Sequence, residues 1–246
     1  MIKSLITMLK DENETLDTFY YGRIFLLQKK KGYRFSVDAP LLADFIQTKE
    51  SDNLCEFGTG NGVISLLLSM KPFNSITALE IQGSLARLAL RNVRLNHLEG
   101  KIFVVQADLR NFYPLKKFDV VFSNPPYIKK KTGHLSALDE KSIAKHELKC
   151  DIFGIMRKTA DIMKKNGRAY FIFPTKRKKD FMSAAKKSNL RIKTLRFVFP
   201  QQHKDSNFFM AECDFFSERI TETTHFILYD ETGQYTPEAK KIFSGS

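Results

Sequence analysis

The chain has 246 residues, 43% of them hydrophobic and 22 of them phenylalanine, so it can bury the core of one large domain or two small ones. No apolar stretch reaches the roughly 18 residues that a membrane-spanning helix needs. The 3 cysteines lie far apart, which argues against a disulfide scaffold or a metal site and predicts a reduced, cytoplasmic setting. The formal net charge of +13 leaves two interpretations, a polyanionic partner or a lysine-rich solvated surface.

Residues 1–48 are predicted to form an N-terminal hairpin and helix lid that packs on a main domain of residues 49–246. The pattern predicts a strand over residues 19–28, a turn at the lysines and glycine of residues 29–32, and a short return strand at 33–35. A helix is expected from Ser36 to Ile46. Either Ser36 or Asp38 can cap this helix, and Pro40 is tolerated in its first turn.

A strand, a glycine turn and a helix follow one another at residues 53–70. The short apolar run NLCEF leads into three alternating glycines, which permit positive φ and a close backbone approach to a ligand. The spacing is E-x-G-x-G-x-G, which differs from the dinucleotide fingerprint G-x-G-x-x-G. Glu56 at the strand end would repel a pyrophosphate, so it suits the cationic amino end of a ligand without phosphate. The loop positions concerned are Gly58, Gly60 and Gly62.

Two further predicted strands, residues 76–79 and 102–106, also end near acids, and a long amphipathic helix over residues 81–96 connects them. Glu80 stands about 20 residues after the glycines, where an acid binds a ribose diol in such sheets. Alternatively, Glu80 is the exposed start of the following helix. Asp108 can accept a hydrogen bond from an adenine amino group, or it can cap the turn before Leu109.

The stretch FDVVFSNPPY at residues 118–127 combines a buried strand with a stiff turn, because neither proline can continue a strand ladder. The Asn124 side-chain oxygen and the Pro125 carbonyl can accept the two N–H groups of an exocyclic amine. Tyr127 can stack on a base, which is worth ~1–3 kcal/mol. The alternative is a proline-rich loop, including Pro126, that only caps the strand.

Strands alternating with helices at this spacing predict an α/β fold with a parallel, doubly wound sheet. In such sheets ligands bind beyond the carboxyl ends of the strands. Glu56, Glu80, Asp108 and Asn124 all stand at carboxyl ends of successive predicted strands. We therefore expect these four side chains to share one edge of the sheet.

The C-terminal part of the chain completes the sheet and carries much of the positive charge. A basic loop with Lys129–Lys131 and the cluster Lys176–Lys179 either contact nucleic acid or are solvated. The short connection after residue 199 predicts antiparallel pairing of two late strands. The predicted elements are a helix over 151–165 ended by Asn166-Gly167, a strand over 168–173, a helix over 176–187, strands over 190–199 and 208–216, an edge strand over 224–229, and a helix over 237–243.

The motifs EFGTGNG, ALEIQ, QADL and SNPPY, in this order, resemble class I S-adenosylmethionine-dependent methyltransferases, and NPPY marks the branch that methylates amino groups. GYRFSVDAPLLADF and YTPEAKKIF narrow the resemblance to the bacterial tRNA1(Val) adenine-37 N6-methyltransferase family. The resemblance implies a Rossmann-like fold whose mostly parallel seven-stranded sheet has helices on both faces and a C-terminal antiparallel strand. It also implies S-adenosyl-L-methionine as cofactor and tRNA as partner, with no metal and no membrane.

The resemblance also implies roles for individual residues. Glu56 lies near the methionine amino end, Glu80 binds the ribose hydroxyls, and Asp108 lies at the adenine of the cofactor. Asp38 belongs to the motif that closes over the methionine end. The target base is held by Asn124, Pro125, Pro126 and Tyr127, of which Asn124 also reaches the cofactor.

Other activities are compatible with the same motifs. The same chemistry could act on guanine N2 in ribosomal RNA, on DNA adenine or on a protein glutamine. The last two usually require an additional target-recognition or N-terminal helical domain, for which the sequence leaves little room. A basic RNA-binding module without turnover and a nicotinamide dehydrogenase are further alternatives. The intact glycine loop and NPPY argue against the module, and Glu56 argues against the dehydrogenase.

Overall fold

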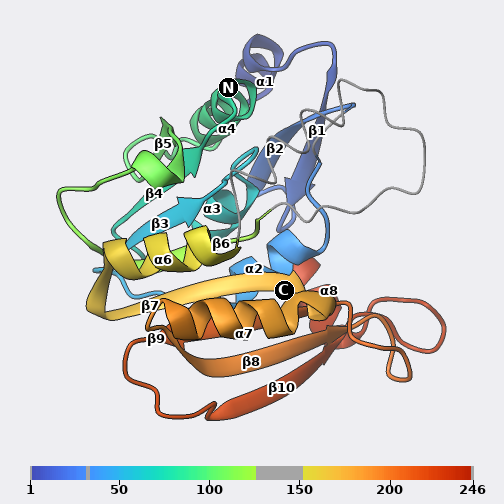
Figure 1. The fold of residues 1–246 in the computed structure, drawn as a ribbon. Helices are drawn as coiled ribbons and strands as arrows, with labels where there is room; N and C mark the ends of the chain where they lie inside the picture. Colours follow the sequence, from blue (N-terminus) through green and yellow to red (C-terminus); the bar gives the residue numbers. More distant parts are fainter. Residues whose placement is uncertain (1, 32–33, 126–151, 245–246) are drawn as a thin grey trace, which may run out of the picture.

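The computed structural model describes residues 2–31, 34–125 and 152–244, and its centre is an eight-stranded sheet (Figure 1). The strand order is β10-β8-β9-β7-β6-β3-β4-β5. β9 is antiparallel to both of its neighbours, and all other pairings in this sheet are parallel. The strands are β3 (Asn53–Phe57), β4 (Ser75–Glu80), β5 (Ile102–Gln106), β6 (Phe118–Ser123), β7 (Met163–Pro174), β8 (Arg191–Phe199), β9 (Phe208–Asp214) and β10 (Glu222–Ile227).

This sheet confirms the predicted Rossmann-like topology, including the late antiparallel strand, which is β9. The number of strands differs from the expected seven. β10 adds an eighth strand at the edge, where it pairs parallel with β8 from Glu222 to Ile227. The extra pairing extends the sheet on the side away from the glycine loop.

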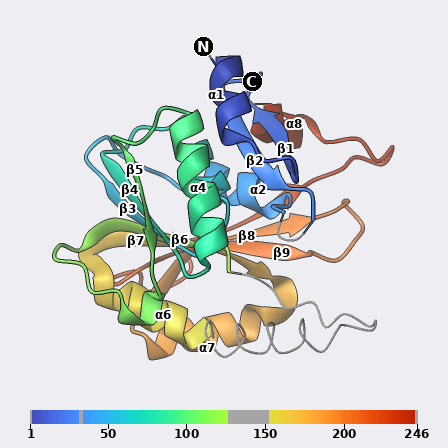
Figure 2. The same cartoon turned by 90° about the horizontal axis from the view of Figure 1, so that it is seen from above.

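Helices cover both faces of the sheet, because alternate residues along each strand point to opposite sides. Val120 and Phe122 of β6 pack in one core cluster with α2 and α3, whereas Val121 packs in the other with α6 and α7. Figure 2 shows α6 and α7 on one side of the sheet and α2 and α4 on the other. The helices are α1 (Ile2–Leu9), α2 (Asp38–Phe45), α3 (Val63–Leu68), α4 (Gly83–Leu95), α6 (Ile152–Ile162), α7 (Lys178–Lys187) and α8 (Pro237–Ser244).

The N-terminal hairpin exists, but its turn lies nine residues earlier in the chain than predicted. β1 (Glu14–Phe19) pairs antiparallel with β2 (Ile24–Lys29), so the turn is at residues 20–23 and not at the lysines that follow β2. Tyr20, Tyr21 and Gly22 all have positive φ in this turn. Two tyrosines in that conformation are uncommon, which is why the pattern did not indicate a turn here. The division into a lid and a main domain at residue 48 remains a prediction.

Two asparagines, Asn92 within α4 and Asn96 at its C-cap, attach this hairpin to the main domain. The Asn92 amide accepts from the Leu27 N–H at 2.7 Å and donates to the Leu27 carbonyl at 3.0 Å. Asn96 makes the same pair of bonds with Phe25, at 2.8 and 2.7 Å. The two side chains thus satisfy the backbone N–H and C=O groups at the outer edge of β2, as a neighbouring strand would.

The boundary between α6 and β7 also differs from the prediction. The helix ends at Ile162 and β7 begins at once with Met163, so Asn166-Gly167 lies within the strand range and does not end the helix. Residues 164–167 stand opposite Asp119 as an irregularity in the β6–β7 pairing, and Lys164 binds the Asp119 carboxylate at 2.7 Å. Among the described residues, none of the helices is long and apolar enough to cross a membrane.

Candidate active site

The glycine loop forms a tight turn between β3 and α3. Gly58, Gly60 and Gly62 have φ values of 70°, 60° and 87°, a region that side chains rarely tolerate. A Cβ on Gly62 would lie 3.4 Å from the Ala89 Cβ, so this glycine lets α4 approach closely. A Cβ on Gly58 would meet no protein atom within 4 Å. The Gly58 position therefore offers open space beside exposed backbone.

Glu80 lies against this loop, as the predicted strand ends require. Its carboxylate accepts hydrogen bonds from the Gly60 N–H at 2.9 Å and from the Gln82 N–H at 2.8 Å. The side chain is almost completely buried. Charged hydrogen bonds of this kind contribute about 1.5–3 kcal/mol each. These two hydrogen bonds show that Glu80 stabilises the conformation of the glycine loop.

Glu56 lies beneath the loop and is only 1% exposed. Its carboxylate accepts hydrogen bonds from the hydroxyls of Thr59, at 2.7 Å, and Ser65. Burial raises the pKa of Glu56 to about 7, although both hydroxyls act in the opposite direction. Sequence reasoning identified the acid but not these two partners, which come from the loop and from the first turn of α3.

Asp108 occupies the turn after β5, where its side chain caps the 3₁₀ helix η1 (Leu109–Asn111). Its carboxylate accepts from the Arg110 backbone N–H at 3.0 Å and forms an ion pair with the Arg110 guanidinium. The Ala107 N–H donates to the Glu80 carbonyl at 3.0 Å, which ties this turn to the end of β4. The capping alternative therefore describes part of what Asp108 does.

Asp38 begins α2 and is largely buried. Its Oδ1 atom accepts from the Ser36 hydroxyl at 2.5 Å and from the Ala39 N–H at 3.1 Å, although Val37 holds the N-cap position. The segment before α2 reaches the glycine loop through Gln28. The Gln28 Oε1 atom accepts from the Phe35 N–H at 3.3 Å and from the Asn61 amide at 3.4 Å.

Asn61 and Asn92 are two functional-site residues that sequence reasoning missed. Asn92 donates to the Asn61 carbonyl at 2.9 Å, in addition to its bonds to β2, so one amide connects the hairpin to the glycine loop. The Asn61 Oδ1 atom is buried and has no hydrogen-bond partner among the described residues. The signal for Asn92 was available: it is a polar residue on the apolar side of α4.

Asn124 and Pro125 follow β6 at the same edge. Ser123 is paired with Phe57 in the sheet, and its hydroxyl donates to the Phe57 carbonyl at 2.9 Å. Asn124 therefore stands one residue beyond this pair, alongside Gly58. Asn124 is half-buried and Pro125 is buried. Pro126 and Tyr127, together with the basic loop at residues 129–131, lie outside the described residues.

Polar residues thus stand at or just after the ends of β3, β4, β5 and β6 and at the start of α2: Glu56, Glu80, Asp108, Asn124 and Asp38. The described residues contain no group of His, Cys, Asp and Glu that could hold a metal. The charges at this edge are acids on the side of β3, β4 and β5. Glu56 and Glu80 are buried and already hydrogen-bonded to hydroxyl or backbone groups, whereas Asp108 is partly exposed and pairs with Arg110. Such a site can bind a small, cationic, hydroxyl-bearing ligand and hold an amine beside it.

A mostly parallel sheet with one antiparallel strand, and a glycine loop directly after β3, defines the Rossmann-like methyltransferase fold. The backbone is similar to the crystal structure of a predicted O-methyltransferase from Agrobacterium tumefaciens. The TM-score is 0.64 at 18% identity, covering 83% of this chain and 94% of that one.

Comparisons of the sequence with known proteins indicate a narrower group within this class. Residues 34–149 match the family model described as methyltransferase small domain. The chain is 27% identical over 203 residues to the tRNA1(Val) (adenine(37)-N6)-methyltransferase of Aliivibrio salmonicida, covering 82% of this chain and 86% of that protein. It is 26% identical over 230 residues to the protein of the same name from Pedobacter heparinus, covering 92% and 96%. These comparisons confirm the resemblance that the motifs indicated.

Proposed function

We propose that this protein transfers a methyl group from S-adenosyl-L-methionine to the N6 amine of an adenine in tRNA. The observation that carries the proposal is the shared edge itself: Glu56, Glu80 and Asn124 meet around the glycine loop from three adjacent strands. The relatives named tRNA1(Val) (adenine(37)-N6)-methyltransferase support the substrate and the modified atom. A tRNA substrate also supports a cytoplasmic location for the protein.

The residues on the β3–β5 side fit this cofactor. S-Adenosylmethionine, when bound, supplies an electrophilic methyl group on a sulfonium. Glu80 would accept hydrogen bonds from the ribose hydroxyls, and Gly58 leaves room for close approach of a ligand. Glu56 and Asp38 are the acids proposed for the methionine end, and the buried Asn61 Oδ1 atom of the glycine loop has no hydrogen-bond partner among the described residues. Asp108 stands at the turn proposed for the adenine ring.

The residues after β6 would hold the target base. The Asn124 Oδ1 atom accepts one N–H of the adenine amine, and the Pro125 carbonyl accepts the other. With both N–H groups held in hydrogen bonds, the amine nitrogen would be positioned to accept the methyl group that the bound cofactor supplies. The N–C bond would form as the C–S bond breaks, and the N–H proton that becomes acidic would pass to solvent. No strong base is needed, so positioning is the main contribution of the protein. Pro126 and Tyr127 are proposed to complete the base site.

An RNA loop suits this site better than a duplex, because a base must leave its stack before reaction. Flipping costs a few kcal/mol in a duplex and less in a loop. The net charge of +13 favours a polyanionic substrate of this kind.

The decisive experiment is transfer of labelled methyl groups from S-adenosylmethionine to total unmodified tRNA, followed by nucleoside mass spectrometry. We expect N6-methyladenosine as the product. N2-methylguanosine in ribosomal RNA, methylated DNA adenine or methylated glutamine would each redirect the assignment to the corresponding substrate. Cofactor binding without transfer to any of these would leave an RNA-binding module.

A further inference from the structure

The edge of the sheet that carries Asn124 continues into a basic surface on the side of β7, β8 and β9. Ser123 at the end of β6 pairs with Phe171, and β7 runs on from there to Pro174 before η2 (Thr175–Arg177) begins. β8 ends at Phe199 on the same edge, because it runs parallel to β7 with β9 antiparallel between them. Residues 175–179 and the β8–β9 loop at 200–207 therefore both extend from the edge that holds Asn124.

Two hydrogen bonds join these segments, which are far apart in sequence. The Thr175 N–H donates to the Asn207 carbonyl at 3.0 Å, and the Ser206 hydroxyl donates to the Thr175 hydroxyl at 3.0 Å. Lys176 and Lys204, one on each segment, are consequently held on one surface. Both side chains are exposed.

This surface holds more positive charge than its own acids can neutralise. Arg177 pairs with Asp180 at 2.7 Å, and the Lys178 ammonium lies 5.2 Å from the centre of the Phe197 ring. Asp205 is the only acid within residues 175–179 and 200–207. Lys176, Lys179 and Lys204 are exposed and have no ion-pair partner among the described residues. We call these three lysines the basic edge.

The position of these lysines gives the fold no evident benefit. Lys176 and Lys179 stand at the start of α7, where the partial charge of the helix is also positive, so the helix itself is not stabilised by them. Polyanion binding accounts for cations in this place, because unpaired lysines that bind phosphates release counterions.

We propose that the basic edge binds backbone phosphates of the substrate RNA next to the nucleotide whose base enters the Asn124 site. The inference rests on the proposed function, and it deepens that function by assigning the RNA-docking surface to residues 176–179 and 204. The partner is identified by charge complementarity and by the shared sheet edge. An RNA chain bound here would run from the β7–β9 side towards β6, away from the buried acids of the cofactor side.

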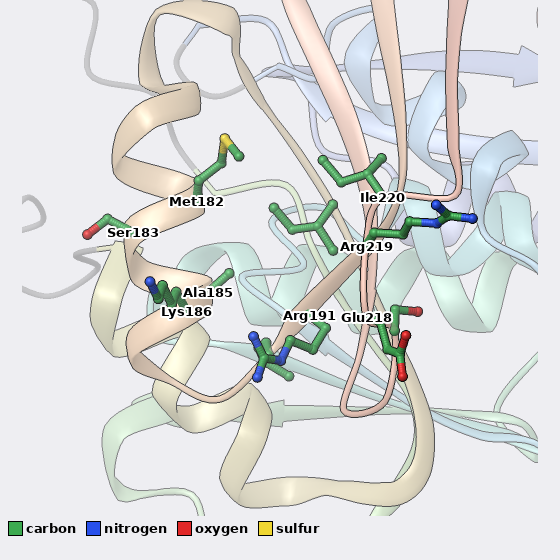
Figure 3. Close-up of a pocket in the computed structure, with 11 residues that line it drawn as sticks. Met182, Ser183, Ala185, Lys186, Arg191, Glu218, Arg219 and Ile220 are labelled. Atoms are coloured by element: carbon green, nitrogen blue, oxygen red, sulfur yellow. The ribbon is translucent and has the colours of Figure 1, made fainter.

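The opposite end of the same sheet supplies a matched control. A cavity of about 350 Å³ lies there between α7 and the segment after β9 (Figure 3). Lys186, Arg191 and Arg219 line it, with Glu218 beside them. Arg191 is the first residue of β8, so these three exposed cations are at the amino ends of the parallel strands. Removing them changes the net charge as much as removing the basic edge.

The test compares K176Q/K179Q/K204Q with K186Q/R191Q/R219Q in the full-length protein. We measure the Kd for tRNA over a range of salt concentrations, the KM and kcat for tRNA, and the Kd for S-adenosylmethionine. For the basic-edge variant we expect tRNA affinity to fall roughly 100-fold at 0.1 M salt. The slope of log K against log salt should decrease in magnitude by about 2–3. The cofactor Kd should stay unchanged, and the opposite-end variant should keep wild-type values.

Equal losses in both variants would overturn the proposal, since net charge alone would then explain binding. A larger loss in the opposite-end variant would move the docking surface to the cavity of Figure 3 and also overturn it. Altered cofactor affinity in the basic-edge variant would indicate that the fold had changed; the single variants K176Q and K204Q, with an expected slope change of about 1 each, then decide the question. If the unmodified chain binds tRNA but methylates none, the proposed function fails while the binding comparison still decides the surface.

Discussion

The two halves of the carboxyl edge of the sheet differ in both charge and burial. On the β3–β5 half, Glu56 and Glu80 are 1% and 5% exposed and bind hydroxyls or backbone amides. On the β7–β9 half, Lys176 and Lys204 are exposed and unpaired within the described residues. Asn124 lies between the halves at the end of β6. The carboxyl edge is therefore divided at Asn124, which we call the junction. The β3–β5 half is acidic and largely desolvated, and we call it the dry half. The β7–β9 half is basic and exposed to solvent.

This difference corresponds to two kinds of ligand. A small cofactor is recognised by a few desolvated groups, whose interactions are strong because little water screens them. An RNA backbone is recognised by exposed cations, whose interactions weaken as salt is added. Cofactor binding should consequently be nearly independent of salt, whereas tRNA binding should be steeply dependent on it. The following predictions test the division, from the largest expected effect to the smallest.

The largest effect is expected at the junction. Asn124→Ala removes the acceptor proposed for one N–H of the adenine amine and leaves both halves in place. We expect kcat to fall about 1,000-fold, which is typical for loss of one preorganised polar group at a reacting centre. Single-turnover methylation of tRNA measures this step. The Kd values for cofactor and for tRNA should each change less than about threefold.

Asn111→Ala is the matched control, because Asn111 is an exposed asparagine of η1 outside the proposed base site. It should retain full activity. Wild-type kcat in Asn124→Ala would contradict the assignment of Asn124 to the target base and, with it, the junction between the halves.

The second effect concerns the dry half and depends on pH. The pKa of Glu56 is raised from 4.5 to about 7, mainly by burial. The folded protein thus keeps a proton that the unfolded chain loses between pH 4.5 and 7, so stability falls as pH rises through this window. The total loss is about 3 kcal/mol, and it is complete above pH 7. Glu56→Gln abolishes this titration, so at pH 8 the variant should be more stable than the wild type.

Denaturant unfolding of the ligand-free protein at pH 5, 6, 7 and 8 measures this effect. The comparison variant is Glu99→Gln, which changes an exposed acid in the turn after α4. Glu99→Gln should follow the wild-type pH profile. A Glu56→Gln profile parallel to the wild type would show that the Glu56 carboxylate is not the buried acid of this half.

The positions of Asn124 and of the acids at the strand ends were predictable from the sequence, whereas the contacts that support them were not. The strands at 102–106 and 118–123 have the predicted bounds, because short β-branched and aromatic runs between turns are strong local signals. Glu56, Glu80 and Asn124 were placed by strand ends alone. Local reasoning failed where distant segments determine the outcome. The Asn92 and Asn96 bonds join residues 65 and 71 positions apart, and no local pattern identifies their partners in β2.

The basic edge was also only partly predictable from local sequence. The cluster at residues 176–179 was visible as charge, but its neighbour Lys204 was not, because only the β7–β9 and β8–β9 pairings bring residue 204 to the same surface. The start of β7 was missed for a related reason: the sequence MKKNG at 163–167 resembles a helix end, but Met163 already pairs with Phe118 of β6.

The third prediction separates two roles of Glu80 in the dry half. Glu80→Ala removes acceptors from the Gly60 and Gln82 amides and from the proposed ribose contact. Cofactor affinity should fall about 30-fold, equivalent to roughly 2 kcal/mol. Calorimetry with S-adenosylmethionine and its 2′-deoxy analogue distinguishes loop support from ribose binding. The wild type should prefer the natural cofactor about tenfold, and the variant should not discriminate. Persisting discrimination in Glu80→Ala would reject the ribose role.

The smallest effect is expected at Asp108, where the dry half reaches solvent. Its carboxylate side chain is 19% exposed and is shared with Arg110, whose side chain is 50% exposed, so water weakens this ion pair. Asp108→Asn keeps an oxygen that can cap the Arg110 N–H but loses the charge. We expect cofactor affinity to fall less than about fivefold, near 1 kcal/mol. Raising the salt concentration should reduce the difference from wild type, whereas the Glu80→Ala difference should persist. A large, salt-independent loss in Asp108→Asn would make Asp108 a third desolvated acid of this half and would extend the dry region to the end of β5.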